Sequence, residues 1–201
     1  STIVTDDTMK KMGKRKVLFL ILALAAVLRL WRFSDVPVSL FGDELDVGYH
    51  AYSLWTTGKD YMGQRLPFYI HSFCEWRAPL LMYFTAPFVG IFGLNEWGVR
   101  LAPLFFGLVN IFLIYLLTKE IFSKEKVALA SAFLIAIAPW HIHYSRVAFE
   151  STLLLSLVLL GTIAFLKEKW LTAAVSFALS FYAYSTANVF VTLWGLGLIF
   201  M

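Results

Sequence analysis

Residues 99–117 have the sequence VRLAPLFFGLVNIFLIYLL, in which Arg100 carries the one charge. A helix of this length can cross the hydrocarbon core of a bilayer, which takes about 17–25 apolar residues. The core offers the backbone no water to bond with, so a helix, which pairs its own polar groups, is the favoured structure there. This block therefore predicts a membrane-spanning helix.

Further apolar blocks lie on both sides of this one. They cover residues 17–33, 127–144, 152–166, 171–184 and 189–201. The whole chain of 201 residues is 60% apolar and 15% charged, with a mean hydropathy of +0.74, whereas soluble domains average about 45–50% apolar and about 25% charged. None of the blocks has the two-residue alternation of barrel strands. We therefore predict an all-α, polytopic integral membrane protein.

Basic residues concentrate directly before the first apolar block. They are Lys10, Lys11, Lys14, Arg15 and Lys16. Such an excess is typical of a cytoplasmic flank, and the block that follows ends at residues 28–33 without a small-residue cleavage site. We predict a cytoplasmic basic tail over residues 1–16 and an uncleaved first span. Since the basic run has this membrane explanation, the net charge of +4 does not indicate nucleic acid binding.

The topology depends on residues 79–94, an apolar block of 16 residues that contains Pro87. If this block lies in the interface, the lysine turns at 119–126 and 167–169 fall on the same side as the N-terminal basic run. If it spans, both turns move outside, against the positive-inside rule. We therefore predict two juxtamembrane helices, at 46–57 and 79–94, in a first outer loop of about residues 34–97. Residues 17–201 then form one transmembrane module.

This topology gathers three polar segments on the outer face. They are the pair Asp43-Glu44 in the first loop, residues 141–150, and residues 184–188. We expect them to converge at one end of the helices.

The pair Asp43-Glu44 has two interpretations. Adjacent carboxylates repel each other, which raises the pKa of one of them and suits it to general-base work near neutral pH. Alternatively the pair stabilises the start of the helix that follows, because acidic side chains favour a helix N-terminus. The sequence leaves both open.

Arginines also gather on the outer face, whereas the lysines concentrate on the cytoplasmic side. We single out Arg77, Arg100 and Arg146 as ligands of a lipid phosphate, because the guanidinium is planar and permanently charged. The alternative is ordinary snorkelling at helix ends. Arg146 and Glu150 are four residues apart and would share a helical face, either as a local ion pair or as part of a site, since charges at membrane depth often mark sites.

The sequence gives little evidence for a disulfide or for a metal site. Cys74 is the one cysteine, so no internal disulfide forms. His141 and His143 are two residues apart, a spacing that does not put two ligands on one helix face. We predict no metal site, and leave a divalent metal ion open as a cofactor.

Together these motifs resemble the opening of the GT-C glycosyltransferases. The residues that carry the resemblance are Leu28-Arg29-Leu30-Trp31, Pro37, Phe41-Gly42-Asp43-Glu44, Arg77-Ala78-Pro79, Arg100-Leu101-Ala102-Pro103, Ala138-Pro139-Trp140, Ser145-Arg146 and Glu150. The most similar group is the protein O-mannosyltransferase and aminoarabinose transferase type, glycosyltransferase family 39 in the broad sense. The resemblance covers about residues 27–188.

The resemblance implies a polyprenyl-phosphate-linked sugar as donor and transfer with inversion. Asp43 would deprotonate the acceptor, Glu44 would assist or orient it, and Glu150 would complete the acidic site. Arg100 and Arg146 would neutralise the departing lipid phosphate. The chain departs from the family pattern at Glu150, where many relatives have Asp, and at Arg77-Ala78, which replaces a His/Lys-Pro pairing.

We therefore expect a membrane glycosyltransferase whose partners are a lipid-linked sugar, membrane lipid and an acceptor still to be identified. We expect it in the plasma membrane of a prokaryote, with the N-terminus cytoplasmic and the active face outside. Because the sequence ends inside an apolar block, we also expect a fragment or a truncated chain that lacks the part that selects the acceptor. The alternatives are a transporter or flippase for a lipid-linked substrate, which would place charges nearer the midplane, and a non-catalytic scaffold.

Overall fold

The computed structural model describes residues 2–72 and 75–200. Most of these residues are helical. The helices are α1 (Thr2–Leu30), α2 (Gly42–Thr57), α3 (Leu80–Phe92), α4 (Glu96–Phe122), α5 (Glu125–Ile137), α6 (Pro139–Tyr144), α7 (Ser151–Leu166), α8 (Trp170–Phe181) and α9 (Ala187–Ile199). Two short antiparallel strands, β1 (Ile70–Ser72) and β2 (Glu75–Arg77), lie between α2 and α3 in the chain. Cys74, the one cysteine, lies outside the described residues.

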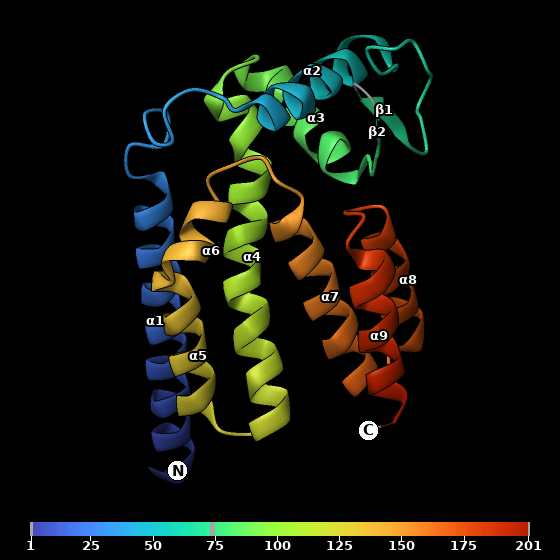
Figure 1. The fold of residues 1–201 in the computed structure, drawn as a ribbon. Helices are drawn as coiled ribbons and strands as arrows, with labels where there is room; N and C mark the ends of the chain where they lie inside the picture. The colour runs from blue at the N-terminus through green and yellow to red at the C-terminus, as the bar shows by residue number, and fades with distance from the viewer. Residues whose placement is uncertain (1, 73–74, 201) are drawn as a thin grey trace.

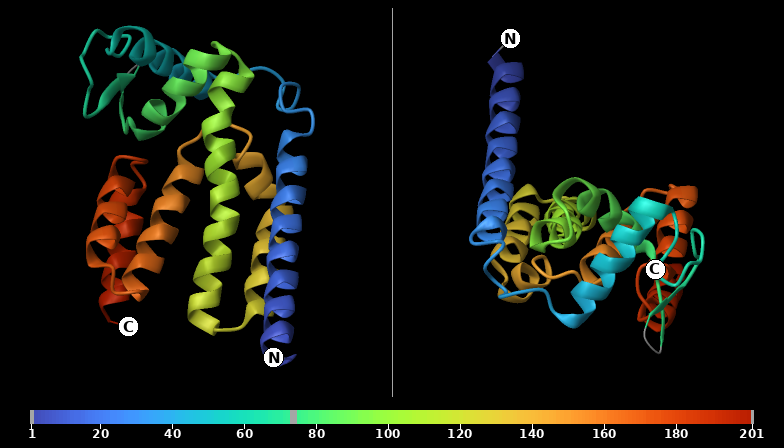
Figure 2. Two further views of the ribbon diagram at one scale, coloured as in Figure 1. Left: turned by 180° about the vertical axis from the view of Figure 1, so that it is seen from behind. Right: turned by 90° about the horizontal axis from the view of Figure 1, so that it is seen from above.

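The elements form a bundle and an end layer (Figures 1 and 2). The bundle contains α1, α4, α5, α7, α8 and α9, and the N-terminal part of α1 leans away from the others. The end layer, which consists of α2, α3 and the two strands, lies over one end of the bundle. The lysine turns at 119–126 and 167–169 lie at the opposite end, near both termini (Figure 1). As predicted for residues 79–94, α3 does not run along the bundle (Figure 1).

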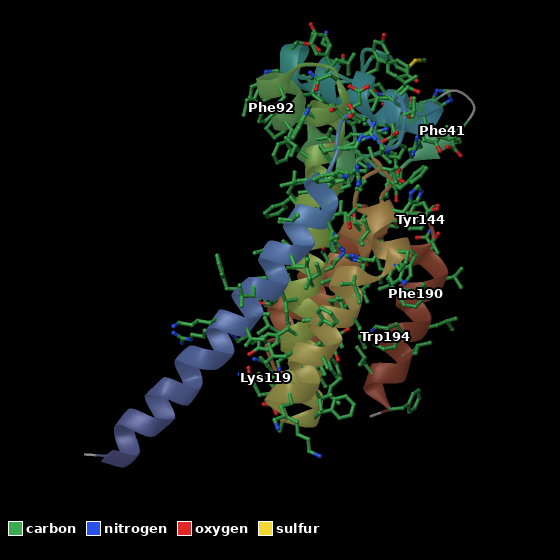
Figure 3. All side chains as sticks on the ribbon, turned by 90° about the vertical axis from the view of Figure 1, so that its left-hand side faces the viewer. Phe41, Phe92, Lys119, Tyr144, Phe190 and Trp194 are labelled. Carbon is green, nitrogen blue, oxygen red and sulfur yellow. The ribbon has the colours of Figure 1, made fainter. Side chains whose placement is uncertain are left out.

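Helix α4 is the central element and contacts α1, α3, α5 and α7. Within the described ranges, α4 is the helix that is long and apolar enough to cross a membrane, with a mean hydropathy of 2.1 over 18 residues. Helices α3, α7, α8 and α9 are apolar but shorter. Large apolar side chains lie exposed on the bundle, including Phe190 and Trp194 of α9 (Figure 3). Exposed apolar surface of this kind is typical of a protein that contacts lipid or another protein.

Small residues bring the bundle helices together. Ala128, Ala132 and Ala136 recur every fourth residue along α5 and are completely buried, so they form one stripe. They pack with Ala25 of α1 and Ile111 of α4. Small side chains let helix backbones approach closely, which is how helices associate without a hydrophobic driving force.

Glycines play the same part in the end layer. A Cβ on Gly90 of α3 would overlap the indole of Trp55 on α2. A Cβ on Gly48 of α2 would overlap the side chains of Leu94 and Val99. The end layer therefore packs against itself and against the start of α4 at backbone distance.

The hairpin corrects the prediction of an entirely α-helical chain. Its strands are three residues long, and Ile70 pairs with Arg77. A strand this short is not recognisable in the sequence from alternation of apolar and polar residues. Ile70 is completely buried. The buried Ile70 anchors the hairpin, and the hairpin in turn carries Arg77.

Helix boundaries differ from the predictions at three places. Helix α2 begins at Gly42 rather than at residue 46, so that Asp43 and Glu44 lie in its first turn. The block at 127–144 is divided at Ala138, where Pro139 starts a new helix, because proline lacks an N–H and clashes with the preceding turn. Helix α1 extends back through the predicted tail to Thr2.

Candidate active site

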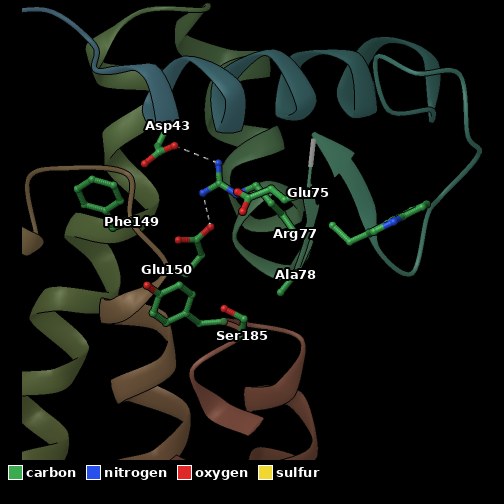
Figure 4. Close-up of a pocket in the computed structure, with 9 residues that line it drawn as sticks. Asp43, Glu75, Arg77, Ala78, Phe149, Glu150 and Ser185 are labelled. Carbon is green, nitrogen blue, oxygen red and sulfur yellow. Dashed lines mark hydrogen bonds and ion pairs between the residues drawn. The ribbon is translucent and has the colours of Figure 1, made fainter. Parts of the chain in front are cut away.

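A pocket of about 250 Å³ lies between the end layer and the bundle (Figure 4). Its lining comes from α2, from β2 and the residue after it, and from the loops before α7 and before α9. The lining residues are Asp43, Glu75, Trp76, Arg77, Ala78, Phe149, Glu150, Tyr184 and Ser185. Each of the three polar segments predicted to converge contributes to this lining. Their convergence is confirmed.

The two carboxylates of the Asp43-Glu44 pair face in different directions. Glu44 is buried, with an exposed side-chain fraction of 1%, whereas the side chain of Asp43 is 51% exposed. Successive helical residues are rotated by about 100°, so one side chain turns to the bundle and the other to the pocket.

The carboxylate of Glu44 joins three segments of the chain. It accepts hydrogen bonds from the backbone N–H of Phe41 at 3.1 Å and of Ala148 at 3.0 Å. It also accepts two bonds from Arg100, from Nε at 2.8 Å and from Nη2 at 2.8 Å. The Phe41 bond caps α2, so the helix-start interpretation holds for Glu44. These four bonds leave Glu44 no free position for substrate.

The guanidinium of Arg100 also makes several hydrogen bonds within the protein. Besides Glu44, its guanidinium donates to the carbonyl oxygens of Pro37 at 3.0 Å and Ser39 at 2.6 Å. Its side chain is completely buried. The geometry therefore makes Arg100 the clamp that ties the loop before α2 to the start of α4, and does not present it to the pocket.

Arg77 is the cation of the pocket. Its Nη2 donates to Glu150 Oε1 at 2.7 Å, and its Nη1 donates to Asp46 Oδ2 at 3.0 Å. Asp43 Oδ1 lies 3.7 Å from Nη1, and Glu75 Oε1 lies 4.0 Å from Nε. Figure 4 shows Asp43 and Glu150 on either side of the guanidinium. Three elements, α2, β2 and the start of α7, therefore meet through one side chain.

The charges around Arg77 are predominantly negative. Burial alone would lower the pKa of Arg77, but Glu150, Asp46 and Asp43 outweigh it and raise that pKa above its ordinary value. Arg77 is therefore charged at neutral pH. Four carboxylates lie within 4.0 Å of this guanidinium, and three of them, Asp43, Glu75 and Glu150, line the pocket with it.

Arg146 lies apart from this group. Its Nη2 donates to the carbonyl oxygens of Arg32 at 2.9 Å and Val36 at 2.6 Å. Its buried Nε has no hydrogen-bond partner among the described residues. Burial, reinforced by the nearby charge of Arg100, lowers the pKa of Arg146. The predicted local ion pair with Glu150 is absent from the described part of the chain, because Glu150 bonds to Arg77 instead.

The sequence interpretation missed Asp46 and Glu75. Asp46 lies three residues after Asp43 and so shares a helix face with it, a signal that was available once a helix start at Gly42 was considered. Glu75 is the first residue of β2, and no pattern in the sequence marked it.

No group of three or more His, Cys, Asp or Glu residues within 2–72 and 75–200 is placed to hold a metal ion. The carboxylates of the pocket face Arg77, which occupies the position that a cation would take. His141 is buried, and its Nδ1 lies 2.7 Å from Nη2 of Arg29. It is thus part of the packing between α1 and α6.

The sequence profile of a known family matches most of this chain. The family is described as dolichyl-phosphate-mannose-protein mannosyltransferase, and the match covers residues 76–200. The chain belongs to this family. The resemblance to GT-C glycosyltransferases of family 39 is thereby confirmed. No curated protein and no solved structure matches the chain.

The matched range includes Arg77, Arg100, Arg146 and Glu150, four of the residues singled out from the sequence. Asp43 precedes the matched range. Its place in the site therefore depends on the geometry of α2 and on the resemblance in the first outer loop.

Proposed function

We propose that this member of the mannosyltransferase family transfers a sugar from a polyprenyl phosphate to an acceptor hydroxyl bound in the pocket beneath α2. The observation that carries this proposal is the position of Asp43. It is a half-exposed carboxylate in the pocket, and Arg77 and Glu150 lie beside it (Figure 4). Glu44, its neighbour in the sequence, is closed off by four hydrogen bonds.

Asp43 is the general base of the proposed reaction. One of its carboxylate oxygens takes the proton of the acceptor hydroxyl while the hydroxyl oxygen forms a bond to the anomeric carbon of the sugar. The bond from that carbon to the phosphate oxygen breaks, and the lipid phosphate leaves with the electron pair. Attack from the face opposite the phosphate inverts the anomeric centre.

Arg77 stabilises the leaving phosphate in this proposal, because it is the arginine that borders the pocket. A guanidinium suits phosphate oxygens in charge and geometry. Glu44 and Arg100 act indirectly by fixing the first turn of α2. The proposal that Arg146 is a second phosphate ligand rests on the family resemblance alone, because Arg146 is not among the residues that line the pocket and its unpartnered Nε–H is buried.

We further propose that the bundle lies in the membrane and that the end layer lies on its outer face. The exposed apolar side chains of the bundle support this arrangement. So does the placement of the lysine turns at the far end, since cytoplasmic loops are rich in lysine. The charges of the pocket lie at the end of the bundle rather than at its middle, which favours transfer over transport.

The test is an Asp43→Asn variant in membranes, assayed for release of polyprenyl phosphate from a polyprenyl-phosphate sugar. The amide keeps the shape of the side chain and removes the base, so we expect the transfer rate to fall by about 100-fold or more. Asp35→Asn is the matched control, because Asp35 lies in the segment that leads into α2 and pairs with Arg32 in solvent. Full activity in Asp43→Asn would refute the role of Asp43.

A further inference from the structure

A second group of titratable residues lies behind Arg77, away from the pocket. Asp46 and His50 are one turn apart on α2 and both are buried. One oxygen of Asp46, Oδ2, accepts from Arg77. The other, Oδ1, accepts from the hydroxyl of Tyr61 at 3.2 Å and lies 3.6 Å from Nε2 of His50. Asp46 thus connects Arg77 to His50 and Tyr61.

Hydrogen bonding within the described part of the chain does not explain the burial of His50. Its side chain is completely buried and stacks on the ring of Tyr61, with the centroids 3.8 Å apart. Neither of its ring nitrogens has a hydrogen-bond partner among the described residues. Nearby Asp60 is also buried, and its Oδ2 is likewise unpartnered there. An unpaired buried polar atom destabilises the folded protein, and an apolar ring at position 50 would avoid that cost.

The charges around His50 come from three parts of the chain. Asp46 lies on its own helix, Asp60 and Tyr61 follow α2, and Arg77 lies on β2. Burial is the largest influence and lowers the pKa of His50 below its ordinary value of 6.5; Arg77 acts in the same direction, against Asp46 and Asp60. The ring is therefore neutral at neutral pH, so that Arg77, and not His50, is the cation that pairs with Asp46.

We propose that Tyr61, which donates to Asp46, and His50, which stacks on Tyr61, are positioning residues that keep Asp46 against Arg77 and thereby fix the guanidinium at the edge of the pocket. When His50 is neutral, Asp46 binds Arg77 and Tyr61. When His50 takes up a proton, it competes for Asp46 and repels Arg77, and the guanidinium loses its orientation. The positioning role rests on the proposed function, whereas the charge coupling between His50 and Arg77 does not.

The coupling is tested without any assay of transfer. The full chain, labelled with ¹³C-histidine in detergent micelles, is titrated by NMR, and the His50 signal is assigned by its loss in His50→Gln. We expect Arg77→Gln to raise the titration midpoint of His50, because a cation is removed, and Asp46→Asn to lower it. The exposed His143 serves as an internal control. A His50 midpoint that is the same in all three proteins would overturn the coupling.

The positioning role is tested by the pH dependence of transfer from a polyprenyl-phosphate sugar. We expect His50→Gln to lower kcat about tenfold, because a catalytic group moved by 1 Å costs up to about 100-fold, and to lose the part of the acid limb that follows His50. Tyr61→Phe keeps the ring stack, removes one bond to Asp46, and should act in the same direction with a smaller effect. His143→Gln should match the unmodified protein.

These outcomes separate the two ideas. If His50→Gln and Tyr61→Phe both keep the original kcat and pH profile, the positioning role is wrong. If the unmodified protein releases no polyprenyl phosphate while the NMR midpoints shift as expected, the proposed function fails and the coupling stands.

Discussion

The chain builds two arginine–carboxylate centres of opposite character within one small region. At the first, Arg100 and Glu44 are completely enclosed and each fills its remaining positions with backbone groups. At the second, Arg77 is shared among several carboxylates and borders a pocket. The same pair of residue types holds the fold together in one place and is available for chemistry in the other. Accessibility, and not residue type, separates the two roles.

The largest expected effect comes from breaking the enclosed centre. Arg100→Ala leaves the carboxylate of Glu44 buried without its cation, so we expect the free energy of unfolding to fall by about 3–5 kcal/mol. Denaturant titration in detergent measures it. Arg32→Ala is the control, because Arg32 pairs with Asp35 at the surface, where such pairs contribute about 0–1 kcal/mol. If Arg100→Ala lowers the free energy of unfolding no more than Arg32→Ala does, Arg100 is not the clamp proposed here.

Breaking the open centre should cost less stability and more activity. Arg77→Ala removes two charged hydrogen bonds, but Glu150 then borders the pocket and Asp46 keeps its hydrogen bond from Tyr61, so we expect the free energy of unfolding to fall by about 1–3 kcal/mol. Transfer should fall by about 100-fold or more. Both the free energy of unfolding and the transfer rate should be measured on one preparation of each variant. The contrast between the two centres is wrong if Arg77→Ala lowers the free energy of unfolding more than Arg100→Ala does.

The pH dependence of stability should follow His50. Because the pKa of His50 is lowered in the folded protein, the unfolded chain binds the proton more tightly, and stability falls as the pH falls below 6.5 towards the folded pKa. Above 6.5 this contribution is fully present. Thermal unfolding between pH 5 and pH 8 should show a smaller decline in His50→Gln than in the unmodified protein. An identical decline would mean that folding leaves the pKa of His50 unchanged.

The smallest effect is expected at the far end of the bundle. Lys167 and Glu120 form an ion pair of 3.1 Å there, and both side chains are more than a third exposed. Lys167→Gln should change the free energy of unfolding by less than about 1 kcal/mol and leave transfer unchanged. A loss of transfer in this variant would show that the two ends of the bundle are coupled.

Hydropathy predicted most of the helices, because each apolar block became a helix or a pair of helices. The lysine turns predicted that α3 lies off the bundle, which in turn predicted that three loops meet at one end. The hairpin could not be predicted from hydropathy, because strands of three residues are too short to show a two-residue alternation.

The pairing of charges could not be predicted from the sequence. Arg100 and Glu44 are 56 residues apart, and no local spacing indicates that they meet or that they enclose each other. Asp43 and Glu44 looked equivalent as neighbours, and the rotation of a single helical residue separated them. Asp46 and His50, three and seven residues after Asp43, lie on the face of α2 that carries Asp43 and were detectable from that spacing.

The close contact between α2 and α3 has a consequence for sequence variation across the family. At Gly90 the indole of Trp55 occupies the place of a side chain, so the two positions share one volume. A relative with a larger residue at the position of Gly90 has to carry a smaller one at the position of Trp55, or its helices separate. Compensating substitutions at these two positions would trace the contact through relatives whose structures have never been determined.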